Sequence, residues 1–253
     1  MSDTSSLTQS NDIAVLAIDT AFDECSVALT SATVRDICFS KRPRKHADDV
    51  LPLVQTLLQQ HQLSLASINT IAMIHGPGSF TGLRIGASVT QGLAFGTDCP
   101  VVCVSSLAIL AYDSLLKSAH QNKEQRIFIA VCLHARESEF YFAIYSFDHA
   151  FTPIAEKHDQ ILGAESLKSV FNHFMLMMVE QSMPSVWIGA GSGWAHPLLI
   201  DFQTSFDEVQ ISPDCNALLL ADLAVKSFQN GLAISPEAAT PIYLNDDMQY
   251  RTV

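Results

Sequence analysis

Histidine and cysteine are the side chains of this 253-residue chain best suited to hold a metal ion. The nine histidines include no two that are three or four residues apart, the spacing that places two imidazoles on one helix face. The six cysteines form no C-x-x-C pair, the spacing typical of zinc ribbons and thiol redox sites. The sequence therefore predicts no metal site built from neighbouring ligands, and we expect buried, reduced cysteines.

Glycine is unevenly distributed along the chain. Six of the eleven glycines lie between Gly76 and Gly96, although a glycine within a helix costs roughly 1 kcal/mol relative to alanine. A turn at 76–81 precedes a helix predicted at 82–96, and backbone N–H groups at such a helix start can bind a phosphate. Gly76, Gly78 and Ser79 are therefore candidate phosphate-binding residues.

The same turn also fits a structural function, which we favour: a tight turn in which Ser79 or Thr81 caps the following helix. It is not the phosphate loop of a P-loop nucleotidase, because no Gly-Lys-Ser/Thr follows it. It is not the nucleophile elbow of a hydrolase, because Phe80 stands where that turn needs a serine. The turn therefore provides no catalytic residue.

The predicted helix at 82–96 has one stripe of small and apolar residues. At about 100° per residue, the stripe covers an arc of about 120°. Its members are Gly82, Ile85, Gly86, Val89, Gly92, Leu93 and Gly96. Such a stripe lets another backbone come close, and that neighbour is equally compatible with a segment of this chain or with a partner protein.

The spacing of apolar residues predicts alternating strands and helices. A second amphipathic helix is expected at 48–60, with Val50, Leu53 and Leu57 on one face and Pro52 near its first turn. Strands are expected at 13–18, 25–30, 34–39, 70–74, 101–104, 126–133, 139–147, 151–156 and 185–188, a loop at 189–193, and helices at 166–180 and 215–229. This order predicts an α/β fold with mixed sheets and two loosely related lobes.

Composition limits the classes of function. Acidic residues outnumber basic ones 26 to 14, and the resulting net charge of -12 disfavours direct binding of nucleic acid. Residues 1–12 are polar and are expected to form a disordered tail rather than a signal peptide. No run of about 20 apolar residues is present, so we expect no membrane span and a cytoplasmic location.

Several segments together resemble the TsaB (YeaZ) family of bacterial tRNA threonylcarbamoyladenosine biosynthesis. The most specific is HGPGSFTGLRIG at 75–86, continued by QGLA at 91–94. Weaker matches are LAIDTA at 16–21, CSVAL at 25–29, PRKH at 43–46, AR at 135–136, EFY at 139–141, GSGW at 191–194 and PIYL at 241–244. One departure is His134, which stands where the family usually has an acidic residue.

The resemblance implies a two-lobed fold of the actin/Hsp70/sugar-kinase type. We expect an RNase H-like lobe at 13–105 and a smaller lobe at 106–253, with the last helix, 215–230, placed to pack back on the first lobe. The family works as a non-catalytic partner of TsaD, the paralogue that transfers the threonylcarbamoyl group to the adenosine next to the tRNA anticodon. The implied partners are a TsaD-like paralogue and a TsaE-like ATPase, with a homodimer when the chain is alone and tRNA reached only through the complex.

The same resemblance implies that the helices at 48–60 and 82–96 form the dimer interface. The expected interface residues are Val50, Leu53, Leu57, Gly82, Ile85, Gly86, Val89, Gly92 and Leu93. The catalytic paralogue carries an H-x-x-x-H metal pair after the strand that follows its glycine block. Ser106 and Leu110 occupy those positions here, and a hydroxyl and an isobutyl group cannot clasp a metal ion, so we expect an accessory subunit rather than an enzyme.

Asp19 and Thr20 lie where the superfamily has its first phosphate-binding turn, so they join the candidate nucleotide site. A polar strand end is the simpler interpretation, and we favour it. The alternative function is an ATP-binding phosphotransferase of the same superfamily. For the accessory subunit we expect no cofactor on the chain alone, with ATP and magnesium bound only in the complex.

Overall fold

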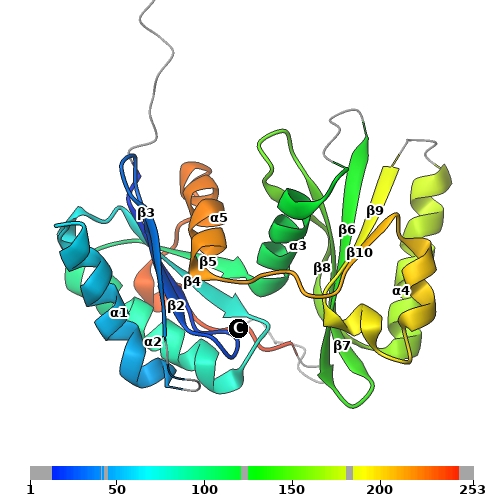
Figure 1. The fold of residues 1–253 in the computed structure, drawn as a ribbon, viewed down its shortest axis with the longest axis horizontal. Coiled ribbons are helices and arrows are strands. Elements are labelled where there is room, and N and C mark those ends of the chain that lie inside the picture. The colour runs from blue at the N-terminus through cyan, green and yellow to red at the C-terminus, as the bar shows by residue number, and fades with distance from the viewer. Residues whose placement is uncertain (1–12, 41, 43–44, 121–124, 181–184, 245–253) are drawn as a thin grey trace, which may run out of the picture. The chain divides into compact units, whose positions relative to one another are not determined.

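The computed structural model describes residues 13–40, 42, 45–120, 125–180 and 185–244. The tail predicted at 1–12 lies outside these residues. Contacts divide the chain into two compact units, residues 1–104 with 216–241 and residues 105–215 with 242–253. Each unit contains a five-stranded sheet with helices packed against it (Figure 1).

The first unit is built on a sheet of order β3-β2-β1-β4-β5. Its central strand β1 pairs antiparallel with β2 and parallel with β4. The elements are β1 (Val15–Asp19), β2 (Ser26–Thr30), β3 (Arg35–Phe39), α1 (His46–Gln60), β4 (Thr70–Gly76), α2 (Phe80–Thr97), β5 (Val101–Ser105) and α5 (Ala217–Gln229). Helices α1 and α2 cover one face of the sheet and α5 covers the other (Figure 1).

Helices on both faces bury β1 and β2 completely, which explains why these strands read as continuous apolar runs. Val50 and Leu57 of α1 are fully buried in the core that also contains Ile18 of β1. Helix α5 packs on β1 and β2, where the N–H of Ala217 donates to Ser26 Oγ at 2.9 Å. Helix α5 is therefore part of the first unit.

The second unit has the sheet order β10-β9-β6-β7-β8. Its elements are α3 (Ser106–Lys117), β6 (Arg126–Arg136), β7 (Glu139–Phe147), β8 (Pro153–Gly163), α4 (Ala164–Glu180), β9 (Ser185–Ala190) and β10 (Glu208–Gln210). As in the first sheet, the first strand of an antiparallel meander, here β6, pairs with a parallel neighbour, here β9. The predicted α/β fold with mixed sheets and two related lobes is confirmed.

Several predicted bounds need correction. Helix α1 begins at His46, so Pro52 is its seventh residue and lies beyond the first turn. The strand predicted at 151–156 is Pro153–Gly163, and β9 extends through Gly189 into the predicted loop. The sequence pattern does not predict α3, because every residue from 106 to 115 is buried and no amphipathic period results. In the described part of the chain, no helix is long and apolar enough to cross a membrane.

Candidate partner-binding site

The turn between β4 and α2 is joined to the loop that follows β1. Ser79 is the N-cap of α2, and its Oγ accepts a hydrogen bond from the N–H of Gly82 at 3.2 Å. The N–H of Ser79 itself donates to the carbonyl oxygen of Ala21 at 2.8 Å. Thr20 Oγ1 donates to the carbonyl oxygen of Gly82, also at 2.8 Å. These donors, which a phosphate would need, are therefore used within the lobe.

The glycines of this region are explained by the closeness of the chain's own backbone. A Cβ at Gly78 would lie 2.6 Å from the carbonyl oxygen of Ala21, and one at Gly82 would lie 2.0 Å from that of Thr20. A Cβ at Gly86 would lie 2.5 Å from Thr20 Oγ1. The backbone of the loop after β1 therefore occupies the space beside Gly78, and Ser79 and Thr20 already have hydrogen-bond partners within the lobe.

Gly76 and Asp19 complete the predicted phosphate site. Gly76 has a φ of 133°, a backbone conformation that residues with a Cβ rarely adopt. Asp19 is only 2% exposed, and its Oδ1 accepts a hydrogen bond from the N–H of Ala21 at 2.9 Å. Burial raises the pKa of this carboxyl to about 7, although the hydrogen bond from Ala21 opposes the shift. Both residues thus have a structural reason for their identity.

The predicted interface residues divide into a buried set and an accessible set. Val50 and Leu57 lie in the core, and Gly82 and Gly86 face Thr20. These four cannot touch a partner, so their assignment to the interface is corrected. The residues that keep accessible surface are Leu53, Ile85, Val89, Gly92 and Leu93.

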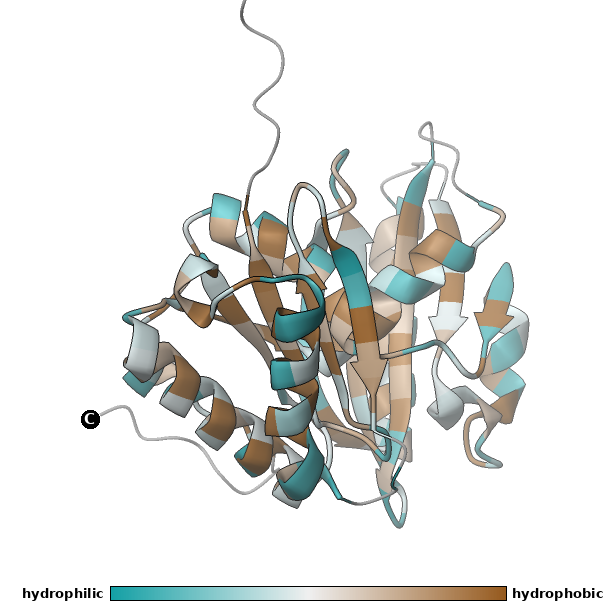
Figure 2. Ribbon diagram, turned by 60° about the vertical axis from the view of Figure 1, so that its left-hand side comes forward, coloured by the Kyte–Doolittle hydropathy of each residue, from teal (hydrophilic) through white to brown (hydrophobic). Residues whose placement is uncertain are grey.

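A groove of about 410 Å³ runs beside α1 and α2, lined by Ala47, Phe80, Thr81, Arg84, Ile85, Ser88 and Val89. The guanidinium of Arg84 stacks on the ring of Phe80, with Cζ 3.8 Å from the ring centroid. Arg84 and Gln91 are the only strongly hydrophilic residues of α2. Figure 2 shows the hydropathy of each residue along the ribbon. The groove therefore has mainly apolar walls and one cationic group.

The accessible surface continues beyond the groove along both helices. Gly92 and Gly96 are exposed, and a Cβ on either would meet nothing within 4 Å. Phe95 is 60% exposed, and Leu51, one helical turn after Ala47, is 49% exposed. We call this surface the α1–α2 face; it comprises Ala47, Leu51, Phe80, Thr81, Arg84, Ile85, Ser88, Val89, Gly92, Phe95 and Gly96.

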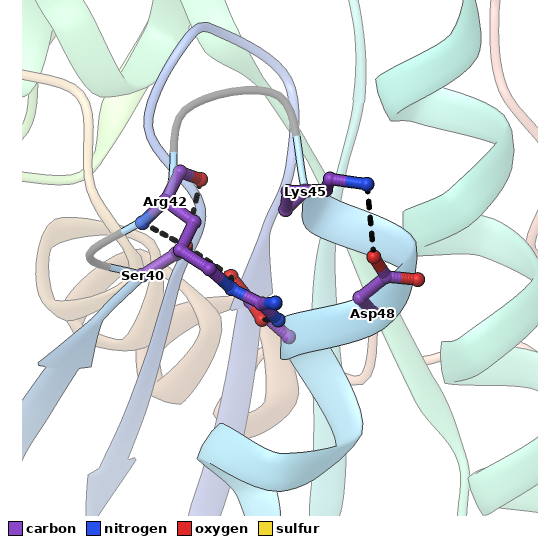
Figure 3. A network of polar contacts seen from close by, with 5 residues as sticks. Ser40, Arg42, Lys45 and Asp48 are labelled. Atoms are coloured by element: carbon purple, nitrogen blue, oxygen red, sulfur yellow. Dashed lines mark hydrogen bonds and ion pairs between the residues drawn. The ribbon is translucent and has the colours of Figure 1, made fainter.

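A polar network holds the start of α1 (Figure 3). Arg42 pairs with Asp49, whose Oδ2 also accepts a hydrogen bond from Ser40 Oγ. These hydrogen bonds, first that of Arg42 and then that of Ser40, hold the pKa of Asp49 below its usual value. Lys45 Nζ lies 3.4 Å from Asp48 Oδ2. Since Lys45 makes no side-chain cap, ion pairs fix this helix start instead.

Comparison with known proteins identifies the family. A profile of TsaD, tRNA N6-adenosine threonylcarbamoyltransferase, matches residues 16–191. The tRNA threonylcarbamoyladenosine biosynthesis protein TsaB of Escherichia coli (strain K12) is 32% identical over 243 residues, which cover 94% of this chain and 96% of that protein. The chain belongs to the TsaB (YeaZ) family.

Further relatives cover the TsaB fold over its whole length. The TsaB protein of Haemophilus influenzae is 27% identical, with 95% of this chain and 97% of that protein covered. The solved structure of YeaZ from Pseudomonas aeruginosa superposes with a TM-score of 0.72 at 29% identity. It covers 92% of this chain and 100% of the YeaZ chain. The resemblance predicted from the glycine block is thereby confirmed.

Two positions singled out by comparison with TsaD lie on α3. Ser106 and Leu110, the positions at which the resemblance implied a metal pair in the paralogue, are 0% and 3% exposed. Among the described residues, no group of three or more histidine, cysteine, aspartate and glutamate side chains is arranged to hold a metal ion. These two positions serve the packing of α3 in this TsaB relative.

His134, the departure from the TsaB pattern, lies at the end of β6. Its ring stacks on that of His196, with centroids 5.1 Å apart, and its Nε2 lies 2.9 Å from the carbonyl oxygen of Glu137. Arg136 pairs with Glu139 through Nε and Oε2 at 2.5 Å. Arg136 therefore has a carboxylate partner although position 134 is not acidic.

Sequence reasoning missed part of the α1–α2 face. Phe80, Arg84, Ser88 and Phe95 lie outside the glycine arc, yet all four are exposed on α2. The sequence did contain an indication of this exposed surface. A helix face in contact only with water usually carries several charged residues, whereas the side of α2 opposite the core is mainly apolar.

Proposed function

We propose that this chain is a non-catalytic subunit that pairs with a TsaD-like paralogue and supports threonylcarbamoyl transfer to tRNA. Membership of the TsaB family supports a part in tRNA threonylcarbamoyladenosine biosynthesis. The observation that carries the pairing is the α1–α2 face, where a mainly apolar groove adjoins exposed Phe95 and the open positions of Gly92 and Gly96. Exposed apolar surface of this kind is typical of a protein interface.

The α1–α2 face suits a helix of the partner. Ser88, Gly92 and Gly96 follow at four-residue spacing, so they share one side of α2 and let another backbone come close. The groove beside Ile85 and Val89 has mainly apolar walls, which suit apolar side chains of a partner. With no paralogue present, a second copy of the chain offers the same surface, so we also propose a homodimer in isolation.

The net charge of the chain and the hydrogen bonds of the turn before α2 bear on its other partners, tRNA and ATP. A net charge of -12 makes direct binding of tRNA unfavourable, so we propose that tRNA is reached only through the complex, with a TsaE-like ATPase as a further component. Because Ser79 N–H and Thr20 Oγ1 are engaged within the lobe, we propose that the chain alone binds no ATP or magnesium. The same engagement argues against an independent phosphotransferase.

Reconstitution tests the proposal. The assay combines the TsaD-like paralogue, the TsaE-like ATPase, tRNA and threonylcarbamoyl-AMP. Modification of the tRNA is measured with and without this chain. We expect omission of the chain to abolish multiple-turnover modification. Unchanged modification without it, or turnover by the purified chain alone, would overturn the proposal.

A matched pair of variants tests the surface. Ser88→Glu places a charge on the α1–α2 face, whereas Ser169→Glu places the same charge on the exposed side of α4. We expect Ser88→Glu to weaken binding of the paralogue at least about tenfold and Ser169→Glu to leave it unchanged. Equal affinities of the two variants in calorimetry would exclude this face as the interface.

A further inference from the structure

Three consecutive residues after β1 each hold the start of a helix that forms the α1–α2 face. Thr20 Oγ1 donates to the carbonyl oxygen of Gly82 at 2.8 Å, in the first turn of α2. The carbonyl oxygen of Ala21 accepts a hydrogen bond from the N–H of Ser79, the cap of α2, at 2.8 Å. The carbonyl oxygen of Phe22 lies 2.8 Å from Nε2 of His46, the first residue of α1. One loop therefore contacts both helices.

His46 is better explained by this hydrogen bond than by packing. The side chain is 8% exposed, and its Nδ1 is buried with no hydrogen-bond partner among the described residues. Because a carbonyl oxygen only accepts, Nε2 carries the proton and donates to Phe22. An apolar ring would fill the same space without a buried unpaired nitrogen, so the bond to Phe22 is what the imidazole adds.

Thr20 holds α2 in place through close packing as well as through the hydrogen bond of its hydroxyl. It is 3% exposed and lies where Gly82 and Gly86 leave room for it, since a Cβ on either glycine would collide with it. The helix cannot move toward the loop, because the backbones are already in contact. It cannot move away without losing the bond from Thr20 Oγ1 to Gly82.

The residues held by the loop adjoin those that line the groove. Ala47 directly follows His46, and Thr81 directly precedes Gly82. We propose that the loop at 20–22 sets the spacing of α1 and α2 and so shapes the groove before a partner binds, with Thr20 and His46 as positioning residues. This inference rests on the proposed function. Such preorganisation raises the affinity for a partner because the two helices lose less conformational entropy on binding.

Thr20→Val tests the proposal, because valine keeps the shape of threonine and removes the hydroxyl. Thr90→Val is the matched control: Thr90 is a fully buried threonine of α2 whose hydroxyl has no hydrogen-bond partner among the described residues. Thr20→Ser keeps the hydroxyl and serves as the rescue. For each variant, calorimetry gives the affinity for the TsaD-like paralogue, and hydrogen exchange gives the protection of the first turn of α2.

We expect Thr20→Val to weaken binding about tenfold and to speed amide exchange at the start of α2, with Thr20→Ser close to wild type. We expect Thr90→Val to keep the wild-type affinity within about twofold, whatever its thermal stability. If Thr20→Val binds as tightly as Thr90→Val, the loop contributes only to stability and the proposal is overturned.

His46→Phe decides the matter if Thr20→Val does not fold. It removes the donor to Phe22 while filling the same space, and we expect binding to weaken about fivefold; wild-type affinity would overturn the proposal. Ser88→Glu separates this inference from the proposed function. If Ser88→Glu loses binding while Thr20→Val and His46→Phe bind like the wild type, only the positioning function of the loop is refuted. If Ser88→Glu binds like the wild type, the proposed interface itself is refuted.

Discussion

Gly82 and Gly86, in the first half of α2, face Thr20 of their own lobe, whereas Gly92 and Gly96, in the second half, face open space. The first pair is required by the fold, because any side chain would collide with the loop after β1. The second pair is not required by the fold, and an alanine at either position would favour the helix by roughly 1 kcal/mol. The comparison shows that glycines on one stripe can have separate causes.

The geometry of the helix explains why one part of the stripe packs against the lobe while another part is open. At 100° per residue, the midpoint between Gly92 and Gly96 lies about 80° from that between Gly82 and Gly86. The arc predicted from sequence therefore straddles the boundary between the buried and the exposed sides of α2. Its inner edge meets Thr20, and its outer edge belongs to the α1–α2 face.

The largest effect is expected on the inner edge, from Gly82→Ala. The new Cβ would lie 2.0 Å from the carbonyl oxygen of Thr20, a backbone atom that cannot yield as a flexible side chain would. We expect the free energy of unfolding to fall by about 3 kcal/mol, measured by urea denaturation. Gly92→Ala is the control and should raise the free energy of unfolding by roughly 1 kcal/mol. Equal stabilities of the two variants would mean that the halves of α2 do not differ.

The buried carboxyl group of Asp19, next to Thr20 in the sequence, should make the stability of the first lobe depend on pH. Its pKa is about 7 in the folded protein and 3.8 in the unfolded chain, so between these values the unfolded chain releases its proton first. Stability is therefore fully present below about pH 4 and falls as pH rises toward 7, by at most about 3 kcal/mol between pH 5 and 7. Asp19→Asn, which keeps an acceptor for Ala21, should flatten this slope.

Urea denaturation across that pH range gives the slope directly. Asp23→Asn, a change at an exposed aspartate of the same loop, is the control and should keep the slope of the wild type. An unchanged slope in Asp19→Asn would show that another group is responsible for the loss of stability.

Much of the fold could be predicted because local patterns and tertiary structure agree. The strand Ser26–Thr30 and helix α2 have the runs and periods that their burial requires. Helix α3 could not be predicted, because burial on all sides removes the polar face on which a periodicity analysis depends. Strand β8 was predicted too short, since its middle, Glu156 to Gln160, is polar and only partly buried.

The candidate site was only partly predictable, because exposure depends on the neighbours of each helix. The spacing of Val50 and Leu57 indicates one face of α1, but only the sheet beneath shows that this face is the core. The local surroundings of the predicted phosphate-binding residues also depend on distant parts of the chain. Gly78 and Ser79 have the right types and spacing, but Ala21, far away in sequence, takes up the space and the hydrogen bond.

The outer edge of α2 is best tested by Gly92→Leu. Nothing lies within 4 Å of a Cβ at Gly92, so the lobe accommodates the side chain, and leucine favours a helix over glycine by several tenths of a kcal/mol. On a partner-binding face, the same side chain holds the opposing helix away from Ser88 and Gly96. We therefore expect stability equal to or above wild type together with about tenfold weaker binding of the TsaD-like paralogue, or about 1.4 kcal/mol. Calorimetry and urea denaturation on the same sample measure both quantities, and wild-type affinity would mean that Gly92 faces water in the complex as well.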